Sequence, residues 1–224
     1  MTLARRTALR LRDNATGYGW ISIAFHWIVA VFVIYLFVNG KQLEEADSNR
    51  GAAGAVGEGA RRAVEGVARA GGEFARRTAA FVQTDIFANR PLHISIGMIA
   101  LVFIVGRIVW RLTQGQPPKG NDSPALNIVA TLVQWGLLVA LVVLMVTGPL
   151  MNWAVGQPIP VFNWFSLSSP MAAMRTLRQP LELAHGWAAD ALIPLLALHV
   201  LGALKHALID RDGVLRRMIV PARA

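Results

Sequence analysis

The residues of this chain best suited to chemistry are its five histidines, which are His26, His93, His185, His199 and His206. The chain has no cysteine, so disulfides, iron–sulfur clusters, thiolate zinc sites and attachment of a cofactor through Cys-x-x-Cys-His are excluded. A metal or cofactor must therefore be held mainly by histidine, carboxylate or methionine. No two histidines have the His-x-x-x-His spacing that places two ligands on adjacent helical turns, which counts against a zinc or copper site.

The elements that hold these histidines are long apolar runs, which lie at about Ile21–Val38, Leu92–Leu112, Leu126–Met151 and Ala184–Ile209. An apolar run of ~18 residues or more can cross a bilayer as a helix. With 54% hydrophobic and only 16% charged residues, the sequence predicts an all-α membrane protein, a four-transmembrane-helix bundle forming one domain over residues 1–224. The first run is long and lacks an Ala-x-Ala-like end, so we expect an uncleaved span rather than a signal peptide.

The net charge of +9 would suggest nucleic acid as a partner for a soluble chain, but no aromatic-and-basic motif accompanies it. In a membrane protein, basic residues mark the short segments held on the cytoplasmic side. Four spans place the N-terminal tail, the loop between spans two and three and the C-terminal tail on one side. These segments hold Arg5, Arg6, Arg10, Arg12, Arg111, Lys119, Arg211, Arg216, Arg217 and Arg223. We therefore expect both termini in the cytoplasm, lipid around the spans and no nucleic acid.

The positions of the histidines within the spans predict two pairs. His185 and His199 are separated by nearly four whole turns, so they share one face of span four and lie about 21 Å apart along it. Span two begins at the outer side with His93, and span one begins at the inner side with His26. The expected pairs are His93 with His185 and His26 with His199. Two pairs from facing helices predict axial ligands for two haems, and such sites transfer electrons because they leave no open coordination position.

Arg107 and Gly97 follow His93 on nearly the same face of span two. Arg107 falls at the inner level, where a cation could pair with the carboxylates of the inner haem. The alternative is an ordinary arginine at a cytoplasmic helix end. Gly97 would let a flat macrocycle approach the helix, although close packing of two helices explains it equally well.

His206 lies seven residues beyond His199 and next to Lys205, at the expected cytoplasmic boundary. No histidine on another span matches its level, so we do not expect it to be an axial ligand. Two interpretations remain, an interfacial polar residue or a contact to a quinone or a haem propionate.

The segment of residues 41–90 is expected to be an inserted periplasmic loop. Its beginning has a flexible composition. From Ala60 to Phe81, small and apolar residues alternate at steps of three and four, which predicts one weak amphipathic helix. That helix could cover the bundle, or dock a redox partner or the membrane surface; disorder is the third alternative.

Several motifs resemble those of the bacterial cytochrome b561 family. They are Tyr18-Gly19, Phe25-His26-Trp27, Leu92-His93-Ile94-Ser95-Ile96-Gly97, Leu198-His199, Ala203-Leu204-Lys205-His206 and Ile209-Asp210. The resemblance covers residues 17–40 and 90–219. It implies a di-haem b cytochrome of the bacterial inner membrane that exchanges electrons with the quinone pool, with ubiquinone as acceptor. The family often has a histidine early in span three where this chain has Gln134, and short members lack the long outer loop.

Three functions follow as hypotheses. The first is electron transfer across the membrane between a periplasmic donor and quinone. The resemblance suggests superoxide as a donor, with the chain acting as an oxidoreductase, and loop arginines could attract that anion, but nearby acids nearly cancel them. The second is a haem-bearing anchor subunit of a larger dehydrogenase or hydrogenase complex, which the possible docking helix favours. The third is a haem-free scaffold in which histidines only bridge helices.

Overall fold

The computed structural model of the chain describes residues 10–14, 17–56, 89–114, 123–162 and 164–221, and only the backbone of residues 49–56. The predicted amphipathic helix between Ala60 and Phe81 lies outside the described residues. Two short strands form the only sheet within the described ranges, and helices make up most of the rest.

Four long helices dominate the structure: α1 (Trp20–Val56), α4 (Arg90–Thr113), α5 (Pro124–Ala154) and α6 (Arg178–Lys205). Each is long and apolar enough to cross a membrane, so the predicted four-helix membrane protein is confirmed. Two of them begin with the same local signal. The side chains of Asn89 and Ser123 accept hydrogen bonds from the backbone N–H three residues later, and a proline occupies the first turn of each helix.

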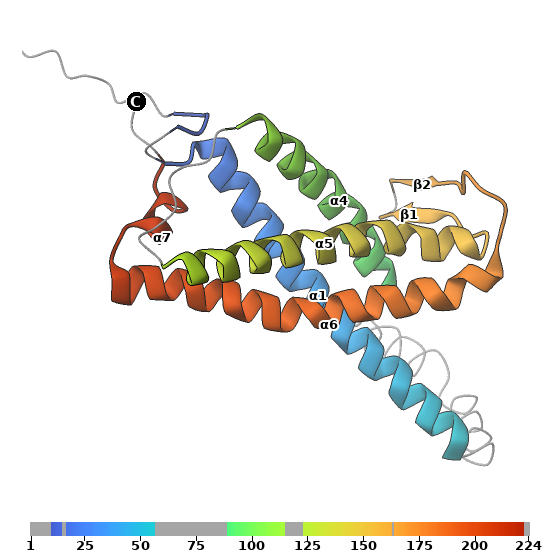
Figure 1. Cartoon of the computed structure of the whole chain (residues 1–224). Coiled ribbons are helices and arrows are strands. Elements are labelled where there is room, and N and C mark those ends of the chain that lie inside the picture. Colours follow the sequence, from blue (N-terminus) through green and yellow to red (C-terminus); the bar gives the residue numbers. More distant parts are fainter. Residues whose placement is uncertain (1–9, 15–16, 57–88, 115–122, 163, 222–224) are drawn as a thin grey trace, which may run out of the picture.

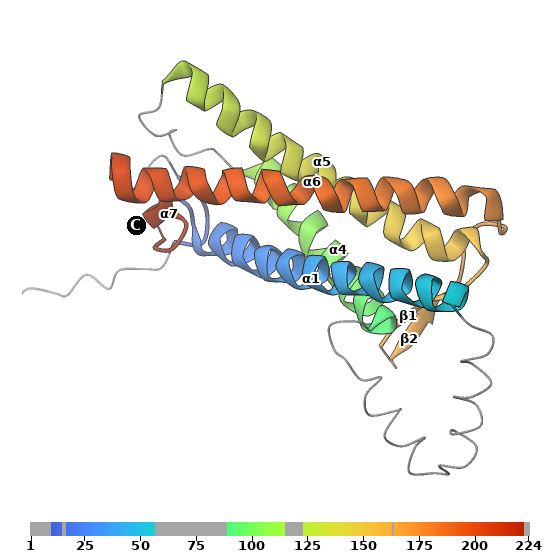
Figure 2. The ribbon, with the colours of Figure 1, turned by 90° about the horizontal axis from the view of Figure 1, so that it is seen from below.

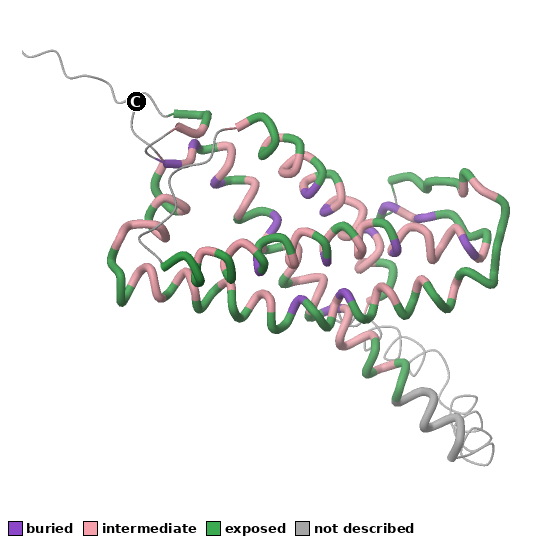
Figure 3. Tube along the Cα trace, viewed as in Figure 1, coloured by how far each residue is buried: buried purple, intermediate pink, exposed green. Residues whose placement is uncertain are grey.

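The four helices form two neighbouring pairs. Helix α5 packs along α6, and α1 packs along α4 (Figure 1; Figure 2). Between α1 and α4 lies a small core of Val29, Ala100 and Ile104. Most other positions are exposed or half-buried (Figure 3), as expected for helices whose apolar surfaces face lipid rather than water.

Helix α1 is longer than the sequence predicts. The apolar run ends near Val38, and we expected a flexible loop from Lys41, but the helix continues to Val56. This expectation was wrong because the polar continuation is rich in good helix formers and is tied to its neighbours by ion pairs. Lys41 donates to Asp190 of α6 at 2.5 Å and to Glu44 at 2.8 Å, and Asp47 pairs with Arg90 at the start of α4.

One end of the bundle, which we call the hairpin end, is covered by an antiparallel pair of strands, β1 (Ile159–Val161) and β2 (Phe165–Leu167). The buried hydroxyl of Ser95 on α4 attaches this hairpin to the bundle. It donates to the carbonyl of Pro160 at 3.3 Å and accepts from the N–H of Phe162 at 2.8 Å. A short 3-10 helix, η1 (Arg175–Leu177), then leads into α6.

The opposite end, which we call the tail end, contains residues 10–14, 17–19 and 206–221. Here α6 continues into one π-helical turn, η2 (His206–Asp210), and a short helix, α7 (Val214–Arg217). Arg211 and Gly213 adopt left-handed backbone conformations, and both lie in the turn between η2 and α7. The indole N–H of Trp27 donates to the carbonyl of Met218 at 2.8 Å, which holds the C-terminal segment against α1.

Candidate functional site

His93 and His185 face each other near the hairpin end. His93 lies in the first turn of α4, His185 lies in α6, and their ring centroids are 6.5 Å apart. This is one of the two pairs expected from the order of the spans. Their elements are held in register by the Lys41–Asp190 and Asp47–Arg90 ion pairs, which join α1 to α6 and to the beginning of α4.

Both rings of this pair are oriented by a hydrogen bond at Nδ1. His93 donates to the amide oxygen of Asn39, a fully buried residue of α1, at 3.0 Å. His185 lies 2.8 Å from the hydroxyl oxygen of Thr147. That hydroxyl donates its own proton to the carbonyl of Val143 at 2.7 Å, so it must accept the proton of His185. Each ring therefore has its lone pair on Nε2, the arrangement in which a histidine binds a metal through Nε2 while a partner holds Nδ1–H.

His26 and His199 form the second expected pair, nearer the tail end. His26 lies in α1, His199 lies in α6, and their ring centroids are 6.2 Å apart. Within the described part of the chain, neither ring makes a hydrogen bond to a side chain. The ring of Trp27 contacts His26 edge-on, with centroids 5.3 Å apart.

The separations of the two pairs fit a metal ion held between facing imidazoles. With metal–nitrogen bonds of about 2 Å, and about 1.1 Å from each nitrogen to its ring centre, two histidines that bind one iron from opposite sides have centroids roughly 6.2 Å apart. The observed value for His26 and His199, 6.2 Å, matches this figure, and that for His93 and His185, 6.5 Å, is slightly larger. Rings packed directly against each other prefer offset stacks or edge contacts with centroids ~4.5–7 Å apart, so the distance alone does not identify the group.

Glycines next to these histidines provide a second test of fit. A Cβ built on Gly97, one turn after His93, or on Gly202, three residues after His199, would meet no protein atom within 4 Å among the described residues. A Cβ on Gly40 or Gly148 would instead lie 3.4 Å from Cε1 of His93 or 3.7 Å from Cε1 of His185. The helix surfaces at Gly97 and Gly202 therefore leave room for a flat group, whereas Gly40 and Gly148 pack directly against the imidazole rings.

Arg107 supplies a third observation. Nη1 of its guanidinium is buried and has no hydrogen-bond partner among the described residues. It is also close enough to His26 and His199 to interact electrostatically with both. A buried cation without a partner is costly, and a carboxylate group such as a haem propionate would provide charge-assisted hydrogen bonds there. The ring separations, the glycines and Arg107 all fit two haems.

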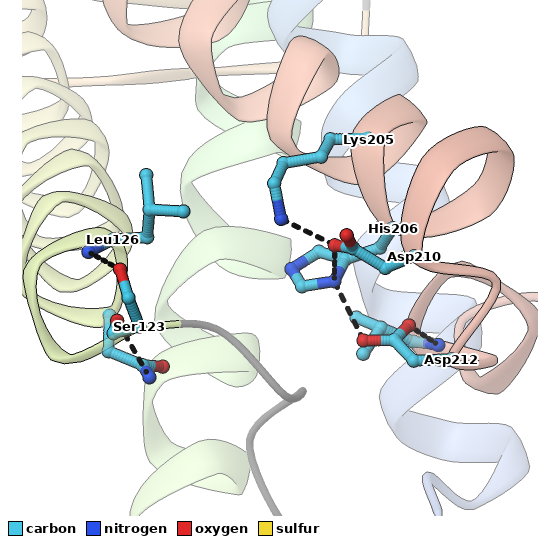
Figure 4. Close-up of polar contacts among 8 residues, drawn as sticks. Ser123, Leu126, Lys205, His206, Asp210 and Asp212 are labelled. Carbon is cyan, nitrogen blue, oxygen red and sulfur yellow. Dashed lines mark hydrogen bonds and ion pairs between the residues drawn. The ribbon is translucent and has the colours of Figure 1, made fainter.

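Lys205 and His206 belong to a separate polar cluster at the tail end (Figure 4). Lys205 donates to Oδ2 of Asp210 at 2.5 Å, and Nδ1 of His206 lies 2.8 Å from Oδ2 of Asp212. Gln134, which replaces the histidine frequent in the resembling family, is exposed on α5.

Sequence reasoning missed the residues that orient the rings. Asn39 and Gly40 follow directly after the apolar run that ends near Val38, and both lie against His93 inside a continuous helix. Thr147 lies within the third apolar span, next to Gly148. Polar residues inside a span are expensive, and that rule applied to Asn39 would have identified it.

A membrane-embedded helical bundle with histidines paired across its helices is the architecture of b-type membrane cytochromes. The family model described as prokaryotic cytochrome b561 matches residues 17–221. The chain belongs to this family, and it is thus a haem b electron-transfer protein of a prokaryotic membrane.

Two relatives are similar over nearly their whole length. Cytochrome b561 homolog 2 of Escherichia coli (strain K12) is 28% identical over 203 residues, which cover 90% of this chain and 90% of that protein. Cytochrome b562 of Cereibacter sphaeroides is 26% identical over 206 residues, which cover 92% of this chain and 96% of that protein.

Proposed function

We propose that this chain is a di-haem b cytochrome that transfers electrons across the bacterial inner membrane, from a donor on the periplasmic side to the quinone pool. The observation that supports this most is the presence of two histidine pairs, with ring centroids 6.5 Å and 6.2 Å apart, at two levels of one four-helix bundle. His93 and His185 would hold one haem, and His26 and His199 the other. When bound, these groups supply two one-electron carriers across the membrane.

The residues around the two pairs have distinct proposed tasks. Asn39 and Thr147 fix the tautomers of the hairpin-end ligands. Gly97 leaves space beside His93. Arg107 offers a buried positive charge to the carboxylates of the tail-end haem. Together they orient the ligands and set the electrostatics, which are the protein's contribution in a cofactor-dependent reaction.

Charge supports an orientation with the tail end in the cytoplasm. Basic side chains gather there in short segments, and the described ones are Arg10, Arg12, Arg111, Arg211, Arg216 and Arg217. Cytoplasmic segments next to spans are enriched in Lys and Arg. Residues 41–90, including the distal part of α1, would then lie on the periplasmic side.

Ubiquinone is the acceptor that the sequence suggests, and Lys205 and His206 are the proposed contact residues. Their cluster lies at the same end as the His26–His199 pair. His206 follows His199 by two helical turns, about 10 Å along the axis. A quinone bound there would lie near the second haem.

The first test is the haem-to-protein ratio of the purified chain in detergent, together with a reduced-minus-oxidised spectrum. Two low-spin b haems per chain are expected. One haem would mean that one pair is wrong. A colourless preparation made with haem supplied would leave a scaffold whose histidines only bridge helices, and would contradict the proposal.

The alternative is a haem-bearing anchor subunit of a larger redox complex, and one observation favours it. An open cavity of about 340 Å³ at the hairpin end lies between α1 and α6, next to His185. Three carboxylates line it, those of Glu44, Glu182 and Asp190, beside the largely exposed ring of Trp187. Lys41 pairs with Glu44 and Asp190, and Arg178 pairs with Glu182, so three carboxylates face two cations and the wall keeps a net negative charge. This charge would repel an anion such as superoxide, whereas a redox protein with a basic face would complement it.

This alternative makes a distinct prediction. A second redox polypeptide should co-purify with the chain from its native membrane and dissociate as ionic strength rises, since exposed charges are screened by salt. A chain that is isolated alone and is reduced rapidly by superoxide would instead favour independent activity.

A further inference from the structure

The β1–β2 hairpin has an apolar face that the bundle covers only in part. Its register pairs Ile159 with Leu167 and Val161 with Phe165. Because side chains directly opposite each other in an antiparallel pair lie on the same face, these four residues share one face of the hairpin. The two on β1 are buried, whereas Phe165 is 54% exposed and Leu167 is 36% exposed. The β1 half therefore packs on the bundle, and the same face of β2 is left open.

The segment that contains this hairpin is unusually apolar for a connection between two spans. Residues 156–174 include no Asp, Glu, Lys or Arg. Trp164, which directly precedes β2, is 73% exposed, and its ring contacts that of Phe162 with centroids 5.1 Å apart. Exposed apolar side chains that lie next to one another usually mark a surface that meets a partner or a membrane.

Ser95 determines the level of the hairpin along the bundle. It donates to the carbonyl of Pro160 and accepts from the N–H of Phe162. Ser95 lies five residues, about 7.5 Å, after Arg90, the charged residue at which α4 begins. Both strands accordingly lie beside the beginning of α4 and the end of α5 (Figure 1). The hairpin is thus alongside the ends of two spans, where a bilayer changes from head groups to acyl chains.

The backbone of β2 limits how deeply the hairpin can lie. Strand β1 is its only strand partner within the described ranges, so the N–H and C=O groups on its other edge need partners from outside the sheet. Hydrocarbon cannot provide them, whereas water and lipid head groups can. Tryptophan is also enriched at this boundary, because its ring combines an apolar body with a polar N–H. An exposed strand edge and an aromatic face together fit the interfacial layer of the bilayer.

We propose that the β1–β2 hairpin is a membrane anchor, with Trp164, Phe165 and Leu167 inserted among the glycerol groups and upper acyl chains of the phospholipid leaflet at the hairpin end. The proposal requires only that the four helices span a membrane, so it does not depend on haem or quinone. Ser95 attaches this anchor to α4 two residues after His93. Lipid contact would therefore also hold the beginning of α4 at the membrane surface.

The charged side chains of the hairpin end lie on a different side of the bundle. They surround the cavity between α1 and α6, where Glu44, with 70% of its side chain exposed, pairs with Lys41. A soluble protein with a charged surface is matched by that side. The uncharged, aromatic hairpin is matched by lipid, and the contrast between the two sides supplies a comparison for the test.

The lack of cysteine in the chain allows one spin label to be placed at a chosen position. The full-length protein, in phosphatidylcholine vesicles, is labelled at Trp164→Cys or Leu167→Cys. Paramagnetic resonance then measures collisions with oxygen, which concentrates in the bilayer, and with a water-soluble nickel chelate. Val139→Cys, in the middle of α5 and 57% exposed, is the lipid reference, and Glu44→Cys is the water reference.

We expect the hairpin labels to collide more with oxygen than with the chelate, and to meet the chelate several-fold less often than the Glu44→Cys label does. Their depth should lie between those of the two references, with helix content unchanged by circular dichroism. A hairpin label as accessible to the chelate as Glu44→Cys overturns the proposal, because this face would then lie in water. A label shielded from both reagents also overturns it, because a protein surface would then cover the hairpin.

Removal of the Ser95 hydroxyl tests how the anchor is attached. Ser95→Ala should increase the mobility of the Trp164→Cys label and its collisions with the chelate, and should leave the Val139→Cys label unchanged. An unaffected hairpin label would contradict the role of Ser95. None of these measurements uses haem or quinone, so a colourless preparation would overturn the proposed function and leave the test of the anchor intact.

Discussion

Thr147 of α5 accepts a hydrogen bond from His185 of α6 across 2.8 Å. The hydroxyl can do so because its own proton is directed to the carbonyl of Val143 on the preceding turn. A hydrogen bond from a threonine hydroxyl to the carbonyl of the preceding turn usually only satisfies the polar group within its own helix. Here it also determines which nitrogen of His185 is available to a metal. The contact also joins two neighbouring helices at the level of the hairpin-end pair.

Replacing Thr147 with valine tests this contact. Valine keeps the shape but removes the acceptor, so Nδ1–H of His185 loses its partner and the ring its fixed orientation. Haem affinity at the hairpin-end site should fall about 10–100-fold, as is typical when the partner of a metal-binding histidine is removed. The measurement is haem titration of the apo protein. Thr131→Val is the matched control, because the Thr131 hydroxyl makes the same back-bond, to Asn127, and its loss should leave haem affinity unchanged.

The pairing of the histidines predicts which haem each single variant loses. His93→Ala or His185→Ala should remove the hairpin-end haem and spare the other, and His26→Ala or His199→Ala should do the reverse. Redox titration of each variant should therefore show one of two midpoint potentials, with both members of a pair losing the same one. A variant that loses the potential assigned to the other pair would refute the topology.

Gly97 gives a test of space rather than ligation. Because a Cβ there would meet no described protein atom within 4 Å, Gly97→Ala should leave both the polypeptide and haem binding intact, whereas the longer side chain of Gly97→Leu should collide with a macrocycle bound to His93. We expect one haem per chain instead of two, with the helix content measured by circular dichroism unchanged. Gly186→Leu is the control, since Gly186 has equally open surroundings but lines the solvent-facing cavity beside Trp187.

Sequence and structure agree where long periodic patterns decide the outcome. The four spans follow from their length and hydropathy, and the facing of His93 with His185 and of His26 with His199 follows from helix rise and span order alone. The extension of α1 beyond Lys41 was not predictable from hydropathy. It depends on Lys41 meeting Asp190 and on Asp47 meeting Arg90, contacts between residues distant in the sequence.

The same distinction applies to the candidate site. A histidine in an apolar span is conspicuous because an ionisable group there is costly. Asn39 and Thr147 are not conspicuous in the sequence, because an amide or a hydroxyl can hydrogen-bond within its own helix. Only the tertiary arrangement shows that they orient the histidine rings. The carboxylate partners of His206 are likewise brought to it by the π turn and the left-handed Arg211, a local geometry that no periodicity predicts.

Arg107 provides the last prediction, on redox potential. A buried positive charge favours the state with one more electron, so it should raise the midpoint potential of the haem held by His26 and His199. Arg107→Gln should lower that potential by tens of millivolts, where about 59 mV corresponds to a tenfold change for a one-electron couple, and should leave the other haem unchanged. Arg107→Lys keeps the charge and should restore most of the potential.

Arg111→Gln is the control, because Arg111 lies one turn further along α4 and is exposed to solvent, which screens its charge. Equal shifts of both haems in Arg107→Gln, or no shift in either, would contradict the assignment of this guanidinium to the haem held by His26 and His199.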